Sequence, residues 1–129
     1  MKHIKRLGDA ELDIMQVVWG SDMPVNSQYI SQGLDGKRDW QLASVLTVLS
    51  RLVTKGFLEV ERRGRNNYYV ALISKQAYQE AEGKQLLDRL YSGSVKGLVS
   101  SLVGGKSISK QDISELRGYL DELEQESAY

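Results

Sequence analysis

The chain has 129 residues, 41% of them hydrophobic, and its 17 basic side chains balance 17 acidic ones. This composition is typical of a globular protein, with room for one domain or for a small domain and an assembly element. It excludes a membrane-spanning run of ~18 apolar residues and, because cysteine is absent, disulfides and thiolate sites. No apolar segment follows the basic amino-terminal residues, so we expect no secretory signal and a cytoplasmic location.

The zero net charge argues at first against a nucleic-acid partner, because binding to phosphates needs clustered Lys and Arg. The charges are unevenly distributed, however. Residues 1–73 carry a net charge of +2 and residues 74–129 a net charge of −2. The asymmetry is informative because three basic side chains of the first part lie together, at Arg62, Arg63 and Arg65.

Two short helices are predicted near the amino terminus. The first begins at the acidic segment 9–11 and ends near Gly20, with Trp19 as a core residue, because apolar side chains recur at three- and four-residue steps. The second is capped by Asn26 or Ser27 and ends near residue 34, and its apolar residues Tyr29, Ile30 and Leu34 are expected to face inward. Residues 33–39 form a loop whose Lys37 and Arg38 either touch phosphate or are simply solvated.

A third helix, over residues 39–56, is the segment around which the rest is organised. On a helical projection one side is an apolar stripe that comprises Leu42, Val45, Leu49, Leu52 and Val53. The opposite side carries small side chains and one cation, namely Ala43, Ser44, Thr47, Ser50, Arg51 and Thr54. Faces that meet only water are usually rich in Lys and Glu. We therefore expect this side to press against a partner, with the DNA major groove as the candidate.

Beyond Gly56 the apolar period changes from 3.6 to 2, which predicts two strands joined by a basic turn. The expected inward side chains are Leu58, Val60, Tyr68, Val70 and Leu72. Three arginines and Asn66 lie at the tip, where they suit backbone phosphates better than they suit solubility alone. Tyr68 and Tyr69 are expected to pack in the strands and the wing rather than to stack on bases.

The order of these elements, three helices and then a basic hairpin, is that of a winged helix-turn-helix. We therefore predict a mostly α fold with a small β-hairpin, in which residues 1–73 bind DNA. The predicted DNA-binding residues are, in the third helix, Gln41, Ala43, Ser44, Thr47, Ser50 and Arg51 and, in the wing, Arg62, Arg63, Arg65 and Asn66.

Residues 74–129 are predicted to be helical, with three apolar stripes separated by glycines. About 55 residues is close to the lower limit for an independent domain, so we expect these stripes to be buried against a second copy in a homodimer. The predicted dimerisation residues are Leu86, Leu90, Leu98, Leu102, Ile113, Leu116, Leu120 and Leu123. Ser109 and Asp112 are expected to cap the last helix.

Catalysis is not expected. The only histidine is His3, close to the amino terminus, so a Ser-His-Asp or Cys-His site cannot be assembled within one chain. No metal site and no cofactor are expected either, because the available ligands are oxygens alone. The opposing hypothesis, supported by the zero net charge, is a protein–protein interaction module without direct DNA contact.

Several short motifs resemble those of the BlaI/MecI/CopY repressors of bacterial penicillinase and copper-transport operons. In residues 1–73 they include Val17-Val18-Trp19, Pro24-Val25, Trp40, Arg51-Leu52-Val53, Lys55-Gly56 and Tyr68-Tyr69, and in the remainder Leu90-Tyr91-Ser92-Gly93 and Ile113-Ser114-Glu115-Leu116. Each motif is weak, but their order and spacing together are fairly specific.

The resemblance implies a homodimeric winged-helix repressor that binds a palindromic double-stranded DNA operator. Relatives often have Lys or Arg at the positions of Ala43 and Leu46, so a different operator is expected here. Copper-responsive members end in Cys-x-Cys pairs, which this chain lacks, and Ser101-Leu102 stands where penicillinase-type members are cut at an Asn-Phe bond. The inducing signal, or a protease that relieves repression, therefore stays open.

Overall fold

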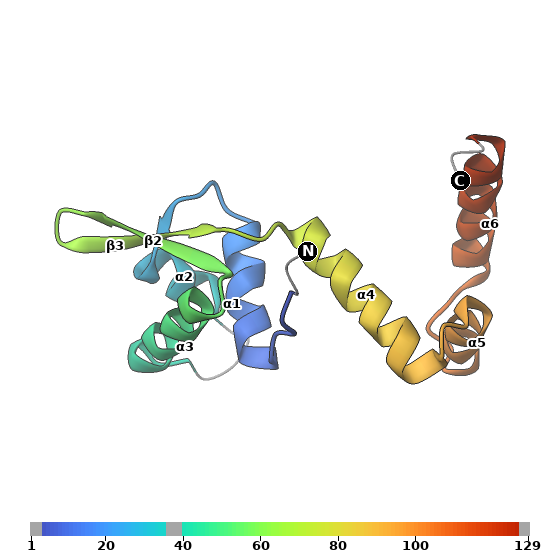
Figure 1. The fold of residues 1–129 in the computed structure, drawn as a ribbon, viewed down its shortest axis with the longest axis horizontal. Coiled ribbons are helices and arrows are strands. Elements are labelled where there is room, and N and C mark those ends of the chain that lie inside the picture. The colour runs from blue at the N-terminus through green and yellow to red at the C-terminus, as the bar shows by residue number, and fades with distance from the viewer. Residues whose placement is uncertain (1–3, 36–39, 127–129) are drawn as a thin grey trace. The chain divides into compact units, whose positions relative to one another are not determined.

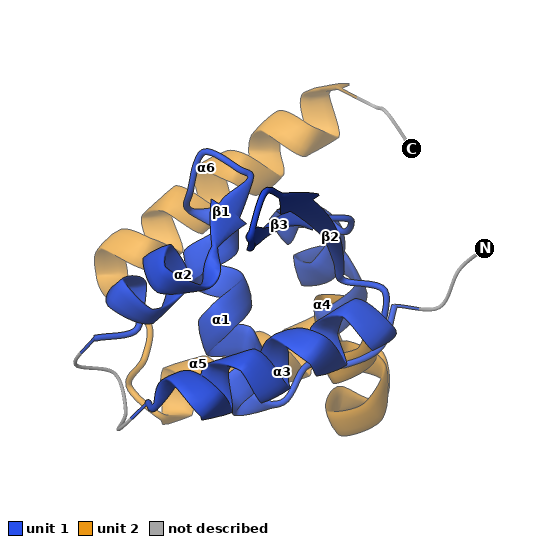
Figure 2. Cartoon of the chain, turned by 90° about the vertical axis from the view of Figure 1, so that its left-hand side faces the viewer, with its two compact units in different colours: residues 1–82 blue, residues 83–129 orange. Residues whose placement is uncertain are grey.

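The computed structural model describes residues 4–35 and 40–126, which form two compact units, residues 1–82 and 83–129 (Figures 1 and 2). Three residues discussed above, His3, Lys37 and Arg38, lie outside the described residues. The elements in chain order are α1 (Asp9–Trp19), β1 (Val25–Asn26), α2 (Ser27–Gly33), α3 (Leu42–Thr54), β2 (Leu58–Arg63), β3 (Asn66–Ala71), α4 (Lys75–Tyr91), α5 (Val95–Gly104) and α6 (Lys110–Glu126).

The helices of the first unit begin as the sequence predicts. Gly8 precedes α1, and the Glu11 carboxylate accepts a hydrogen bond of 2.8 Å from the Gly8 N–H, which satisfies a donor at the helix start. Asn26 caps α2, because its Oδ1 accepts a hydrogen bond of 2.9 Å from the Tyr29 N–H. The prediction that Tyr29 faces inward is wrong: its side chain is 47% exposed, whereas Ile30 is buried.

The buried side of α3 is turned slightly around the helix axis relative to the prediction. Val45, Val48, Leu49 and Leu52 are buried, but Leu42 is 54% exposed, so its assignment to the core stripe is wrong. Leu42 is the first residue of α3, and the core lies against the later turns of the helix. The amino-terminal turn of α3 is consequently open to a partner.

The sheet has three antiparallel strands in the order β1-β3-β2, where the sequence predicted two. The short strand β1 pairs Val25 with Tyr69 and Asn26 with Tyr68. The predicted inward set of β3 is one residue out of phase, because Tyr69 is buried while Leu72, just beyond the strand, is 54% exposed. Since side chains alternate between the faces of a strand, this shift exchanges the two faces of β3. In β2 the prediction is confirmed for Leu58, which is buried, and wrong for Val60, which is 39% exposed.

One hydrophobic core holds the first unit together, and it extends into the first turns of α4. Tyr78 is buried against Trp19 and Phe57, with ring centroids 5.8 and 5.7 Å away. Its hydroxyl accepts a hydrogen bond of 2.9 Å from the Leu7 N–H, and Trp19 Nε1 donates one of 2.9 Å to the Ile73 carbonyl. The prediction that Trp19 packs in the core is confirmed.

The second unit contains the end of α4 together with α5 and α6. These three helices are the ones that the apolar stripes predict. Ser109 and Asp112 cap α6 reciprocally: the Ser109 N–H donates to Asp112 Oδ2 at 2.9 Å, and the Asp112 N–H donates to Ser109 Oγ at 3.0 Å. The hydrogen bond from the Ser109 N–H, together with hydrogen bonding from the Ser109 side chain, lowers the pKa of the Asp112 carboxyl. None of the helices within the described residues is long and apolar enough to cross a membrane.

Candidate nucleic-acid interface

The exposed side of α3 carries the residues that the sequence assigned to base contacts. Ala43, Ser44, Thr47, Ser50 and Arg51 are all exposed, and Gln41 precedes the first turn as the N-cap residue. Arg51 is the only cation among them. The surface is therefore shallow and nearly uncharged, as the sequence predicts.

Two hydroxyls of this surface already donate to their own helix. Thr47 Oγ1 donates to the Ala43 carbonyl at 3.0 Å, and Thr54 Oγ1 donates to the Ser50 carbonyl at 3.1 Å. Such bonds to the preceding turn are common for Thr in helices. With its proton used in this way, the Thr47 hydroxyl can only accept a hydrogen bond from a partner, and its methyl group adds apolar surface.

A polar hollow of about 210 Å³ separates α3 from the hairpin. Figure 1 shows α3 and the hairpin tip at the same end of the first unit. The hollow is lined by Asn26, Ser27, Gln28, Leu46, Arg65, Asn66, Asn67 and Tyr69. The sequence assigned only Arg65 and Asn66 of these residues to an interface, although the predicted Asn26 cap already placed Ser27 and Gln28 at an exposed helix start.

The tip of the hairpin is a two-residue turn formed by Gly64 and Arg65. Gly64 has a φ of +62°, and the first central position of a type II′ turn requires such a value, which favours glycine. The turn is stabilised by a hydrogen bond of 3.2 Å from Arg62 Nε to the Gly64 carbonyl. The side chain of Arg65 is thereby presented at the outermost point of the wing.

The three arginines of the wing differ in the contacts that they already make within the protein. Arg63 contacts Glu61 at 3.4 Å, and its Cζ lies 5.2 Å from the centroid of the Tyr68 ring. Among the described residues no ion pair engages Arg65. Arg63 pairs across the strands with Asn66, and strand alternation places it on the face of the hairpin opposite to Arg62. Arg65 is therefore the guanidinium best placed for an external anion.

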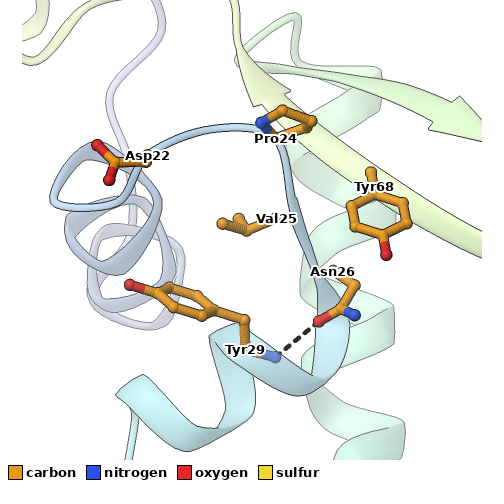
Figure 3. Close-up of a pocket in the computed structure, with 6 residues that line it drawn as sticks. All are labelled: Asp22, Pro24, Val25, Asn26, Tyr29 and Tyr68. Atoms are coloured by element: carbon orange, nitrogen blue, oxygen red, sulfur yellow. Dashed lines mark hydrogen bonds between the residues drawn. The ribbon is translucent and has the colours of Figure 1, made fainter.

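A second hollow, of about 320 Å³, lies beside β1 (Figure 3). It is lined by Asp22, Pro24, Val25, Asn26, Tyr29 and Tyr68. The Asp22 carboxylate would repel a phosphate there, and none of its lining residues is basic. We therefore do not include it in the candidate interface.

A partly buried ion pair joins the end of α3 to the start of α1. Lys55 Nζ lies 2.6 Å from Glu11 Oε1, and Glu11 is 4% exposed. Burial alone would raise the pKa of the Glu11 carboxyl, but the hydrogen bonds from Lys55 and the Gly8 N–H, with the nearby charges of Lys55 and Arg51, lower it overall. Glu11 is therefore ionised at neutral pH and helps to fix the orientation of α3.

The residues assigned to dimerisation all lie in the second unit, on the end of α4, on α5 and on α6. Leu86, Leu90, Leu102, Ile113 and Leu120 are between 38% and 67% exposed, whereas Leu98, Leu116 and Leu123 are half-buried. Within the described part of the chain no three His, Cys, Asp or Glu side chains are close enough to hold a metal ion.

The helices α2 and α3, followed by a basic hairpin, define a winged helix-turn-helix DNA-binding domain, and the predicted fold class is confirmed. The sequence profile of the family described as penicillinase repressor matches residues 7–122. The chain therefore belongs to the penicillinase repressor (BlaI/MecI) family of transcriptional regulators. Both the predicted resemblance and the prediction that the chain is not an enzyme are confirmed by this membership.

Curated relatives match over nearly the whole length. The penicillinase repressor of Bacillus licheniformis is 30% identical over 122 residues, which cover 95% of this chain and 94% of the relative. The methicillin resistance regulatory protein MecI of Mammaliicoccus sciuri is 24% identical over 89% of this chain and 93% of its own.

Two solved structures are similar to the amino-terminal part. The solution structure of the DNA-binding domain of the repressor BlaI is 32% identical, with a TM-score of 0.52, and the match covers 60% of this chain and 94% of that domain. The monomeric form of Bacillus licheniformis BlaI, solved in complex with the blaP half-operator, gives the same identity and coverage with a TM-score of 0.51.

Proposed function

We propose that this protein is a transcriptional repressor that binds a palindromic operator in double-stranded DNA as a homodimer. The observation that carries the proposal is the placement of the exposed, nearly uncharged side of α3 next to a hairpin whose tip presents Arg65, which makes no ion pair within the described residues. A major groove admits a helix with short side chains, and the adjacent backbone attracts arginine. BlaI, which is 32% identical over the matched region, was solved on a half-operator.

The division of labour in this proposal follows the two parts of the sequence. Residues 1–73 contact DNA, with base contacts from the exposed side of α3 and backbone contacts from the wing. Residues 74–129 form the dimer through the leucines of α4, α5 and α6. Two-fold symmetry then matches two half-sites about one or two helical turns apart. Such a repressor works in the cytoplasm, and its release requires a signal or a protease.

The wing contributes affinity rather than sequence preference in this account, since phosphates are the same at every base pair. Arg65→Ala should weaken binding to all sequences and reduce the slope of log Kd against log salt by about 0.9 per lost phosphate contact. Arg63→Ala is the matched control, because Arg63 is already engaged by Glu61 and Tyr68. An equal reduction of the slope in both variants would contradict the assignment of Arg65.

The experiment that tests the function is a footprint of the full-length protein on DNA upstream of its own gene, repeated over a salt series. We expect saturable protection of a palindrome, with affinity that falls as salt rises. The competing hypothesis of a protein–protein interaction module predicts no protection at any salt concentration. Protection without sequence preference would contradict the assignment of α3 to base contacts.

A further inference from the structure

The DNA-facing side of α3 exposes large apolar side chains that a helix meant for water would not carry. Leu42 is 54% exposed and Leu46 is 44% exposed, and the small residue Ala43 lies exposed beside them. Residues four apart lie one above the other on the same side of a helix. Leu42 and Leu46 therefore form a short apolar ridge over the first turn and a half of α3.

The Thr47 hydroxyl on this side has no free proton to donate to a hydrogen-bond acceptor of a partner. The Thr47 proton is donated to the Ala43 carbonyl, so that this hydroxyl faces a partner as an acceptor beside a methyl group. Among the side chains of α3, Ser44, Ser50 and Arg51 remain as donors. The amino-terminal half of α3 is consequently suited to a partner that presents apolar groups at short range.

Polar side chains around Leu46 restrict what that partner can be. Leu46 lines the 210 Å³ hollow together with Ser27, Gln28, Asn66 and Arg65. An apolar protein surface that covered Leu46 would bury these polar groups without partners, at a cost in free energy. A DNA groove provides acceptors for the surrounding donors, because phosphates flank the base edges. DNA is therefore the partner that fits this surface.

Within the major groove the apolar group is the C5-methyl of thymine. We infer that Leu42 and Leu46 read thymine methyl groups, so that each operator half-site has thymines under the amino-terminal half of α3. This inference rests on the proposed function and adds the base preference. One turn of helix spans about 5.4 Å and one base step about 3.4 Å, so the two thymines lie within about two base pairs of each other.

The test removes the methyl groups alone. Binding sites are selected from a random pool of double-stranded DNA with the full-length protein, and the selected duplex is synthesised with deoxyuridine replacing thymine at one position at a time. Uracil keeps every hydrogen-bonding group of thymine. Loss of one buried methyl should weaken binding about fourfold at the positions under Leu42 and Leu46, and uracil elsewhere should have no effect.

Variants of Leu42 and Leu46 show which leucine contacts which thymine methyl group. Leu46→Ala should weaken binding to the thymine duplex and abolish the effect of uracil at one position while leaving it at the other, and Leu42→Ala should do the converse. Leu72→Ala is the matched control, since Leu72 is 54% exposed but lies outside the hollow. Thermal unfolding checks that each variant folds.

The outcomes separate this inference from the function on which it rests. If a selected duplex binds saturably but no uracil substitution changes Kd, or if the uracil effects persist unchanged in both leucine variants, the methyl readout is overturned and the repressor function stands. If no duplex is enriched over the random pool, both are overturned. A uracil effect lost only with its own leucine supports the inference.

Discussion

The two units of the chain use their apolar side chains in opposite ways. Every apolar side chain that is buried among the described residues belongs to the first unit, from Leu7 to Tyr78. From residue 83 to residue 126 no side chain is buried, and α5 and α6 each leave large apolar groups in solvent, among them Val95 and Leu120. The first unit has the core of a self-sufficient domain, whereas the second exposes the surface that a partner would cover.

This difference in burial indicates where the stability of each unit comes from. Burial of apolar area stabilises a fold by roughly 25 cal/mol per Å², and a segment of about 50 residues that buries little of it is marginal alone. Under the proposed function the missing burial comes from a second copy of the chain. Stability of the second unit should then depend on protein concentration, and that of the first should not.

The largest expected effect is on the core of the first unit. Tyr78→Ala should lower its free energy of unfolding by about 3–5 kcal/mol, because a buried ring is lost from between Trp19 and Phe57. Urea unfolding followed by tryptophan fluorescence measures this, since both tryptophans lie in the first unit. Tyr78→Phe keeps the ring and loses the hydrogen bond from Leu7, so about 1 kcal/mol is expected. Equal losses in the two variants would show that the ring does not pack as described.

The next effect concerns the second unit. Leu120 is 49% exposed on the apolar stripe of α6, so Leu120→Asp should place a charge in the proposed dimer interface and weaken dimerisation by about 100-fold or more. Sedimentation equilibrium measures the association. Gln125→Asp adds a negative charge on the opposite side of the helix and should leave the dimer intact. A dimer that survives Leu120→Asp places the interface elsewhere.

A smaller effect is expected from the ion pair that orients α3. The lowered pKa of Glu11 means that this carboxylate stabilises the fold fully at pH values above its unfolded value, near 4.5, and that the contribution is lost as pH falls through the lower folded value. Glu11→Gln should cost roughly 2 kcal/mol at pH 7 and progressively less below pH 4.5. Unfolding in urea from pH 7 to pH 3 measures the difference, and a cost that does not change with pH would contradict the ionised pair.

Much of this fold is predictable because its signals are local. Three helix ends are marked by groups that lie within a few residues of the end. They are the start of the second helix, capped by Asn26, the end of the third helix, followed by Gly56, and the start of the last helix, capped by the Ser109–Asp112 pair. The structure confirms the two caps in its hydrogen bonds, and Gly56 follows the end of α3 with a φ of +86°.

The wrong predictions concern residues and strands that the local sequence pattern does not determine. Strand β3 is apolar on both faces, at Tyr68, Tyr69 and Val70, so its alternation has two possible phases and only the pairing of Val25 with Tyr69 selects one. The strand β1 has two residues, too few for any period. Leu42 looks like a core residue because its helical position borders the buried stripe, and only the packed structure shows that the core does not reach it.

The candidate site was predictable in part for the same reason. The exposed side of α3 and the basic tip follow from spacing, but the hollow joins α2, α3 and the hairpin, and such long-range proximity leaves no periodic signal. The difference between Arg63 and Arg65 likewise depends in part on Tyr68, which lies on the neighbouring strand and which only the register brings close to Arg63.

Under the proposed function, the second unit joins two copies of the chain whose first units then occupy one operator. Sedimentation velocity of the full-length protein with a fluorescent palindromic duplex tests this arrangement most directly, because the mass of the complex gives the number of chains per duplex. We predict two chains on the palindrome at saturation, and weaker binding of Leu120→Asp that proceeds through a one-chain complex. A saturated complex of the unsubstituted protein with one chain, or no complex at all, would contradict the account.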